Sequence, residues 1–295
     1  MRVGLLLKRD KPEAIELGRE LARWLVARGD EAIIARNGDA NGAESGGGRV
    51  VDERELAGHI DLLAVLGGDG TLLHASELVT DGGVPLLGIN LGNLGFLTTS
   101  QPEHSQRVLE LALTGKLRLE RRMRLRIVLE RASGERDQPV VRYACNDAVI
   151  SQGALARLLE FEALLDGSPI TTYRADGLII ATPTGSTAYN LAAGGPILAP
   201  DVQAMIISPI CPHTLTNRPV VVTASSRVRV RLGAGAANVV LTIDGQWATA
   251  FGDGDSVEIH AANRPLLLYR SPDLEYFDVL RAKLHWGERS RSGAT

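Results

Sequence analysis

A short apolar run that ends in a glycine-rich turn constrains the fold of this chain most strongly. Leu62–Leu66 is continuously apolar, as expected for a strand that is buried on both faces of a parallel sheet. It leads into Gly67-Gly68-Asp69-Gly70-Thr71, and a stretch with helical spacing follows. In this arrangement, free backbone N–H groups and the positive end of a helix point to the carboxyl edge of the sheet, where anions bind. The sequence therefore predicts a phosphate-binding turn at Gly67–Gly70.

Asp69 is the unexpected member of this turn, because a carboxylate would repel a phosphate. It could accept a proton from an attacking hydroxyl or hold a metal ion. Alternatively, it could cap the helix that follows by accepting its free N–H groups. The turn is not a Walker P-loop, because no Lys follows the glycines, and its glycine spacing differs from GxGxxG.

The segments around this turn alternate between strand-like and helix-like patterns. Helical spacing of apolar residues occurs over Glu13–Arg28 and from Gln101 through Leu113. Further strands are predicted at Val3–Leu7, Glu31–Ala35 and Pro85–Ile89. Asn37–Gly48 is rich in Gly, Asn and Ser and is predicted to be a surface loop. This alternation indicates a doubly wound α/β domain over residues 1–115.

From residue 116 the pattern changes to period two. Leu117–Glu130 alternates apolar and charged residues, which predicts one amphipathic strand with a solvated, arginine-rich face. More strands are predicted at Val140–Ala144, Leu158–Leu165, Gly177–Ala181, Arg227–Leu232, Val239–Ile243, Ser256–Ile259 and Leu266–Tyr269. Turn signals such as Asp166-Gly167 and Asp244-Gly245 separate them. We therefore predict a largely β domain over residues 116–273, then a C-terminal helix and tail over residues 274–295.

Composition excludes several classes of protein. Lys and Arg number 32 against 35 Asp and Glu, so the net charge of −3 provides no general attraction for nucleic acid or anionic lipid. The sequence contains no run of about 18 apolar residues that could span a membrane. The two cysteines, Cys145 and Cys211, are too few for a disulfide framework or a four-thiolate zinc site. The sequence thus predicts a cytoplasmic protein that binds neither nucleic acid nor membrane.

Three more segments have chemistry of interest. Gly88–Leu97 follows the next predicted strand, so it would lie beside the first glycine turn and form a second wall for one ligand. The run Thr182–Pro196 combines hydroxyls and glycines with Tyr189, which suits sugar hydroxyls, phosphate oxygens and a base. It could equally be a capped helix start. Asp244-Gly245-Gln246 is interpreted as a type I′ hairpin turn.

Together these segments resemble the NAD kinase family. Gly67–Thr71 alone is also similar to lipid kinases that act on diacylglycerol or sphingosine and, more distantly, to phosphofructokinases. Gly88–Leu97, Asn146-Asp147 and Thr182–Tyr189, in this order, resemble NAD kinases specifically, and the likeness extends along nearly the whole chain. Arg174 resembles the proteobacterial branch, which prefers NAD over NADH and ATP over polyphosphate.

The resemblance implies a fold, a reaction and a set of partners. The fold is an N-terminal α/β domain with a C-terminal β-sandwich. The reaction transfers the γ-phosphate of ATP to the 2′-hydroxyl of the adenosine ribose of NAD, which gives NADP and ADP. A divalent metal ion, usually Mg²⁺, takes part, and the absence of an obvious carboxylate cluster suggests that it arrives with ATP. The family also implies a homodimer or homotetramer in which subunits share sites.

The resemblance also assigns residues. Asp69 matches the proton acceptor that activates the 2′-hydroxyl. His74 matches a position that is often basic near the phosphates, although it could also be an ordinary helix-surface histidine. The residues that match dinucleotide contacts are Gly70, Asn146, Asp147, Arg157, Arg174, Asp176, Thr187, Ala188, Tyr189, Asn190, Leu191, Ala192 and Gln246.

Three other functions would share parts of this sequence, and one of them, a Rossmann dehydrogenase, is disfavoured because its GxGxxG turn is absent. A lipid kinase would share Gly67–Thr71, but it needs an apolar or membrane-facing site for acyl chains, whereas residues 182–196 suit hydroxyls and phosphates. A dinucleotide sensor that has lost turnover would be expected to lack Asp69, which is present.

Overall fold

The computed structural model describes residues 1–36, 46–80, 83–132, 138–152, 159–214, 216–233 and 238–286. The chain forms two compact units. The first comprises Met1–Glu120 together with the chain from Leu267 onward, and the second comprises Arg121–Leu266. The sequence divided the chain after residues 115 and 273, whereas the structure divides it after residues 120 and 266. Most of the predicted loop Asn37–Gly48 lies outside the described residues.

The first unit is built on one seven-stranded sheet with the order β3-β2-β1-β4-β5-β19-β6. Neighbouring strands from β3 through β19 pair in parallel. The strands are β1 (Arg2–Leu7), β2 (Glu31–Arg36), β3 (Arg49–Asp52), β4 (Leu62–Leu66), β5 (Leu86–Ile89), β6 (Leu119–Arg122) and β19 (Leu266–Tyr269). The order reverses between β1 and β4, and ligands of open α/β sheets bind at the carboxyl ends of the strands at such a reversal.

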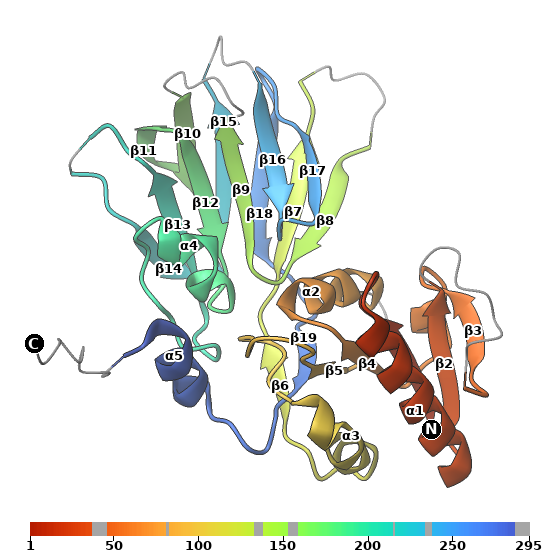
Figure 1. Ribbon diagram of the computed structural model, residues 1–295. Helices are drawn as coiled ribbons and strands as arrows, with labels where there is room; N and C mark the ends of the chain where they lie inside the picture. Colours follow the sequence, from red (N-terminus) through yellow and green to blue (C-terminus); the bar gives the residue numbers. More distant parts are fainter. Residues whose placement is uncertain are drawn as a thin grey trace, which may run out of the picture. The chain divides into compact units, whose positions relative to one another are not determined.

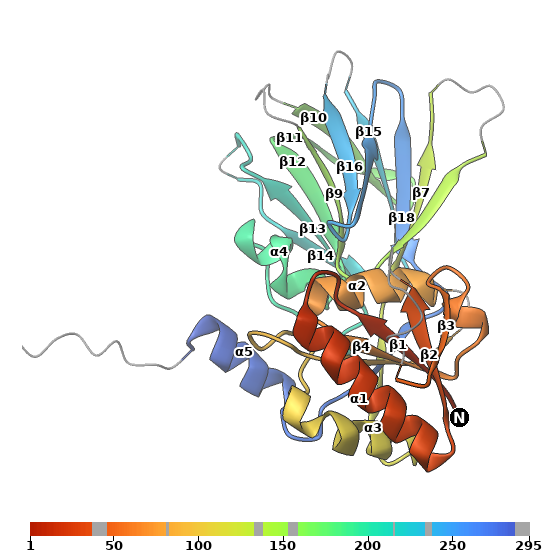
Figure 2. The ribbon, with the colours of Figure 1, turned by 45° about the vertical axis from the view of Figure 1, so that its right-hand side comes forward.

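Helices cover both faces of this sheet, so the predicted doubly wound arrangement is confirmed (Figure 1). Helices α1 (Pro12–Arg28) and α3 (Ser105–Leu113) share an apolar core with Leu87 and Ile89 of β5. Helix α2 (Asp69–Leu78) lies on the other face, where Leu72 packs close to Gly88. Figure 2 shows these helices and the sheet from a second side. Within the described residues of this unit, the other helical segments are the short 3₁₀ turns Leu56–Gly58 and Pro102–His104 and helix α5 (Tyr276–Leu284).

The second unit is a β-sandwich of two six-stranded antiparallel sheets. One sheet contains, in order, β11 (Ser168–Ala175), β10 (Leu159–Leu165), β15 (Arg227–Leu232), β18 (Ser256–Ala261), β7 (Leu125–Glu130) and β8 (Val140–Ala144). The other contains β14 (Val220–Thr223), β13 (Ala204–Ile210), β12 (Gly177–Ala181), β9 (Asp147–Gln152), β16 (Val239–Ile243) and β17 (Trp247–Ala250). A 3₁₀ turn at Gly185–Thr187 and helix α4 (Tyr189–Ala192) follow β12.

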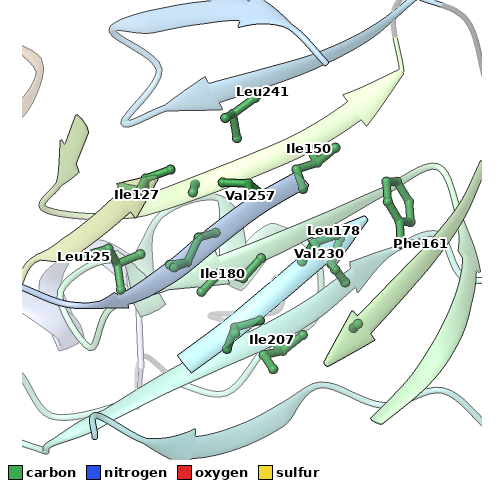
Figure 3. Close-up of a cluster of buried hydrophobic side chains, with 14 of the residues drawn as sticks. Leu125, Ile127, Ile150, Phe161, Leu178, Ile180, Ile207, Val230, Leu241 and Val257 are labelled. Atoms are coloured by element: carbon green, nitrogen blue, oxygen red, sulfur yellow. The ribbon is translucent and has the colours of Figure 1, made fainter. Parts of the chain in front are cut away.

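Alternating side chains of both sheets fill the sandwich core (Figure 3). Ile127, Phe161 and Val257 come from the first sheet, and Ile150 and Ile180 come from the second. This interdigitation is what holds two antiparallel sheets face to face.

Two sequence predictions were wrong. Leu117–Glu130 is not one strand, because β6 joins the α/β sheet whereas β7 joins the sandwich. The change of sheet breaks the alternation, so Arg122 and Arg124 are buried, and the Arg124 guanidinium lies 5.1 Å from the centre of the Tyr143 ring. The strand at Leu266–Tyr269 pairs in parallel with β5 and so completes the α/β sheet instead of the sandwich.

No helix within the described segments is long and apolar enough to cross a membrane.

Candidate active site

Asp69 connects the two glycine-rich loops of the first unit. It is the first residue of α2, and no side chain caps that helix, so the alternative in which Asp69 caps it is not observed. Its Oδ2 accepts a hydrogen bond from Phe96 N at 2.8 Å. Its Oδ1 accepts hydrogen bonds from Leu97 N at 3.1 Å, from Thr98 N at 3.0 Å and from Thr98 Oγ1 at 2.9 Å. The carboxylate is therefore held in one orientation by the second loop.

The second loop comes close because β4 and β5 are parallel neighbours, which places both loops at the same sheet edge as predicted. Gly95 allows this approach, because a Cβ at residue 95 would collide with the Asp69 carboxylate and the Thr98 hydroxyl. Gly70 is exposed next to Asp69, so its backbone is accessible to a ligand. The edge therefore presents exposed backbone beside a fixed carboxylate.

Three cations that the sequence analysis did not consider stand at the same edge. Lys8, Arg9 and Lys11 follow β1, whose neighbour β4 carries the glycine turn. The Lys11 ammonium donates to the carbonyl of Leu91 in the second loop. A cluster of cations directly after the first parallel strand was the signal available in the sequence. These side chains add positive charge where an anionic ligand is expected.

His74 lies on α2 and is partly exposed. Its Nε2 is 3.4 Å from Glu53 Oε2, and Arg9 also reaches Glu53 at 3.3 Å. The histidine therefore lies beside the Arg9–Glu53 ion pair of the first unit.

In the second unit, three sequence motifs meet where neighbouring strands begin or end. Asp147 at the start of β9 is opposite Ala181 at the end of β12, and Ile243 at the end of β16 is opposite Ala148. Thr182 follows β12 and joins the Thr182–Pro196 segment to the Asn146-Asp147 segment through two hydrogen bonds. Its Oγ1 donates to Cys145 O at 2.6 Å, and its N–H donates to Asn146 O at 2.8 Å.

Asp244 connects the turn Asp244-Gly245-Gln246 to residues 145–147. It has φ 50° and Gly245 has φ 65°, as the interpreted type I′ turn requires. Its carboxylate also accepts hydrogen bonds from the backbone N–H groups of Cys145 at 2.6 Å, Asn146 at 2.7 Å and Asp147 at 3.0 Å. From the sequence alone Asp244 is interpretable only as a turn residue, because this second role depends on strand pairing.

Asp147 is buried, with 5% of its surface exposed. Burial and the neighbouring charge of Asp244 raise the pKa of Asp147 to about 7. No residue in the described part of the chain donates a hydrogen bond to its carboxylate. Burial also raises the pKa of Asp244, although its three backbone hydrogen bonds act in the opposite direction.

Residues 187–192, which match dinucleotide contacts, include both accessible side chains and a buried one. Thr187, Ala188 and Leu191 are partly exposed, whereas Tyr189 and Ala192 are exposed. Asn190 is fully buried, and its Nδ2 donates to Ser186 O at 3.0 Å and to Pro196 O at 3.1 Å. Its Oδ1 accepts from Ser208 Oγ at 2.7 Å. The Asn190 side chain thus fixes the shape of the loop and is turned away from solvent.

Arg174 and Asp176 are not brought to this junction. They precede β12, whereas Thr182 follows it, so six residue steps of extended chain separate Asp176 from Thr182 by about 20 Å. Arg174 is exposed, and its Nε lies 2.8 Å from Glu160 Oε1. Asp176 Oδ1 lies 3.9 Å from His213 Nε2. Arg157 lies outside the described residues, and Gln246 is exposed in the β16–β17 turn.

Comparison with known proteins agrees with this geometry. Residues 3–117 match the ATP-NAD kinase N-terminal domain, and residues 145–271 match the ATP-NAD kinase C-terminal domain. The NAD kinase of Syntrophotalea carbinolica is 43% identical over 98% of this chain and 99% of its own length. The NAD kinase of Geobacter sulfurreducens has the same identity and coverage.

Solved structures give the same result. A yeast NADH kinase in complex with NADH aligns with a TM-score of 0.90 at 26% identity and covers 100% of this chain and 90% of its own. An NAD kinase from Archaeoglobus fulgidus in complex with ATP aligns with a TM-score of 0.75 at 25% identity, covering 97% and 99%. Matched domains that cover both units, together with relatives at this identity over nearly the full length, show that the chain belongs to the ATP-NAD kinase family and is a phosphotransferase that phosphorylates NAD.

Proposed function

We propose that Asp69 accepts the proton of the adenosine-ribose 2′-hydroxyl of NAD while the γ-phosphate of ATP is transferred to that oxygen. The observation that carries this proposal is the fixed carboxylate at the carboxyl edge of the parallel sheet. Oδ1 accepts three hydrogen bonds, whereas Oδ2 accepts one from Phe96 N and keeps a free lone pair. A positioned base suits this reaction, because phosphoryl transfer depends mainly on orientation and charge neutralisation.

The exposed backbone at the glycine turn supports a role in binding phosphate oxygens. Gly70 follows Asp69 in the first turn of α2, where backbone N–H groups lack helical partners. Lys8 and Arg9 stand beside this turn because β1 and β4 are neighbours. We assign Gly70 to the dinucleotide site, as the resemblance implies, and the phosphates of ATP to the same edge.

The second unit supplies the dinucleotide contacts in this proposal. The Asp147 carboxylate is buried and receives no hydrogen bond from the described residues, so a ribose hydroxyl that donates to it would offset the cost of its burial. Asn146 directly precedes it and is partly exposed, and Tyr189 is 47% exposed and can offer an aromatic face to a base. Thr187, Ala188, Leu191, Ala192 and Gln246 complete the accessible surface.

We propose that the divalent ion arrives with ATP. Among the described residues, no group of three or more His, Cys, Asp or Glu side chains is arranged to hold a metal ion. The described residues thus do not provide a dedicated metal site, and no step is assigned to a protein-held ion. An ion carried by the phosphates would neutralise charge on the transferred group.

We also propose a homodimer or homotetramer in which Arg174 and Asp176 of one copy serve the site of another. The support is their separation from Asn146 and Thr182 by the length of β12 within one chain. Two free cysteines, one buried and one exposed, are consistent with a reducing compartment, and we place the enzyme in the cytoplasm.

The test is a coupled assay of purified protein with NAD, ATP and Mg²⁺, in which an NADP-specific dehydrogenase detects the product. We expect NADP from the wild type and none from Asp69→Ala, with NAD binding retained in the variant. Equal turnover by both proteins would remove the proposed role of Asp69. Binding of NAD without turnover in the wild type would instead indicate a sensor, and no binding of NAD would reopen the lipid-kinase alternative.

A further inference from the structure

We propose that Asp244 is a positioning residue that holds the Asn146-Asp147 segment in the conformation that binds NAD. Its carboxylate accepts hydrogen bonds from three consecutive backbone N–H groups, those of Cys145, Asn146 and Asp147. This inference rests on the dinucleotide-binding role proposed above for Asn146 and Asp147.

The backbone of Asn146 is held from two sides. On one side, its N–H donates to Asp244 Oδ1 at 2.7 Å. On the other side, its carbonyl accepts from Thr182 N at 2.8 Å. Gly185 also packs directly on this backbone, because a Cβ there would collide with the Asn146 carbonyl.

These backbone contacts leave the Asn146 side chain available to a ligand. The hydrogen bonds of Asn146 involve its backbone, and no described residue contacts its side-chain amide through a hydrogen bond. Asp147 likewise uses its N–H toward Asp244 and keeps its carboxylate without a donor. A fixed backbone that presents two unengaged polar side chains is a preorganised binding site.

The turn itself does not require a carboxylate. A type I′ turn needs positive φ at its two central residues, and Asn satisfies this requirement as well as Asp does. The chain contains a matched case at the β10–β11 turn, where Asp166 and Gly167 have φ 51° and 83°. There the exposed Asp166 accepts one backbone hydrogen bond, from Arg227 N at 2.8 Å.

The position of the Asp244 carboxylate costs electrostatic free energy. It is partly buried, burial raises its own pKa, and the repulsion between its charge and Asp147 contributes to the raised pKa of Asp147, whereas the nearby Arg124 favours the charged form of Asp244. A neutral residue would avoid this repulsion. The three hydrogen bonds from successive N–H groups offset this repulsion, since hydrogen bonds to an ionised acceptor are stronger than those to a neutral one.

The experiment compares Asp244→Asn with Asp166→Asn as the matched turn control, and Asn146→Ala tests the underlying role. Asp244→Asn keeps the turn but replaces one acceptor oxygen with a donor that faces backbone donors. We expect its KM for NAD to rise by about tenfold or more, because charged hydrogen bonds are lost, while kcat and the KM for ATP change by less than about threefold. Amide exchange at residues 145–147 should become faster, and Asp166→Asn should match the wild type in every measurement.

An unchanged KM for NAD in Asp244→Asn, while Asn146→Ala weakens NAD binding, would overturn the positioning role alone. Unchanged NAD binding in Asn146→Ala would instead overturn the proposed role of Asn146. A fall in kcat together with a rise in both KM values would show a general structural role and would also overturn the inference. If Asp244→Asn does not fold, Asp244→Glu keeps the charge but displaces it, and it should show the same selective rise in KM for NAD.

Discussion

At the scale of single residues, the raised pKa of Asp147 makes stability depend on pH. Its pKa is about 7 in the folded protein against 3.8 in the reference state, so the folded form retains a proton that the unfolded form loses between these values. Stability should therefore fall as pH rises from about 4 to about 7 and then level off. At pH 8 this carboxylate should cost on the order of 4 kcal/mol of unfolding free energy.

Asp147→Asn removes this cost, so the variant should gain stability over the wild type as pH rises and match it near pH 4. Urea unfolding at several pH values measures the difference. Asp166→Asn, at an exposed carboxylate, is the control and should show no such trend. A difference between Asp147→Asn and wild type that stays constant from pH 4 to pH 8 would contradict the assignment.

Asp69 and Asp244 show how far single residues can be interpreted from sequence. Asp69 could be singled out because a strand, a glycine turn and a helix start are consecutive in the chain. Its four hydrogen bonds to residues 96–98 could not be predicted, because they depend on the adjacency of β4 and β5. Asp244 was seen only as a turn residue, because its partners at 145–147 lie almost a hundred residues earlier in the chain.

At the scale of elements, the contact between the two glycine loops should depend on Gly95. Gly95→Ala places a Cβ where the Asp69 carboxylate and the Thr98 hydroxyl lie, so the loop must move away. Backbone donors of residues 96–98 would then lose their acceptor, and stability should fall by about 1–3 kcal/mol. The midpoint of urea unfolding measures this loss, and kcat should fall with it because Asp69 loses its fixed orientation.

Gly92→Ala is the control in the same loop. A Cβ at residue 92 meets its nearest atom, Asn90 Oδ1, at 3.8 Å, which is an ordinary contact. Its unfolding free energy should stay within about 0.5 kcal/mol of the wild type. An equal loss of stability in the two variants would mean that the loop, and not its contact with Asp69, is sensitive to substitution.

The elements that the sequence predicted well are those with a strong local period. The predicted strand at Leu62–Leu66 and the predicted helix at Glu13–Arg28 are observed, the latter with one residue more at its start, because burial imposes clear patterns on them. Strand β13 was missed, and it contains Pro209, a residue that argues against an inner strand. The placements of β6 and β19 could not be predicted, because sheet membership depends on partners distant in sequence.

At the scale of the whole molecule, removal of the divalent ion should stop turnover without affecting the fold. The described residues offer no cluster of metal ligands, so the ion is proposed to depend on ATP for its placement. With EDTA we expect no NADP, an unchanged thermal midpoint, and NAD affinity within about twofold of that with Mg²⁺. A large fall in the thermal midpoint would instead reveal a metal site within the protein.

Shared sites between copies can be tested by mixing two inactive proteins. If Asp176 of one copy completes a site that contains Asp69 of another, then Asp69→Ala and Asp176→Ala should each be inactive alone. In a mixed dimer, one site would carry both substitutions and the other would carry neither. Random association of equal amounts should then restore about a quarter of wild-type activity in a dimer. If each chain forms its whole site alone, mixing restores nothing, because every site then carries one substitution. The distance that β12 places between Asp176 and Asn146 within one chain is the reason to expect recovery.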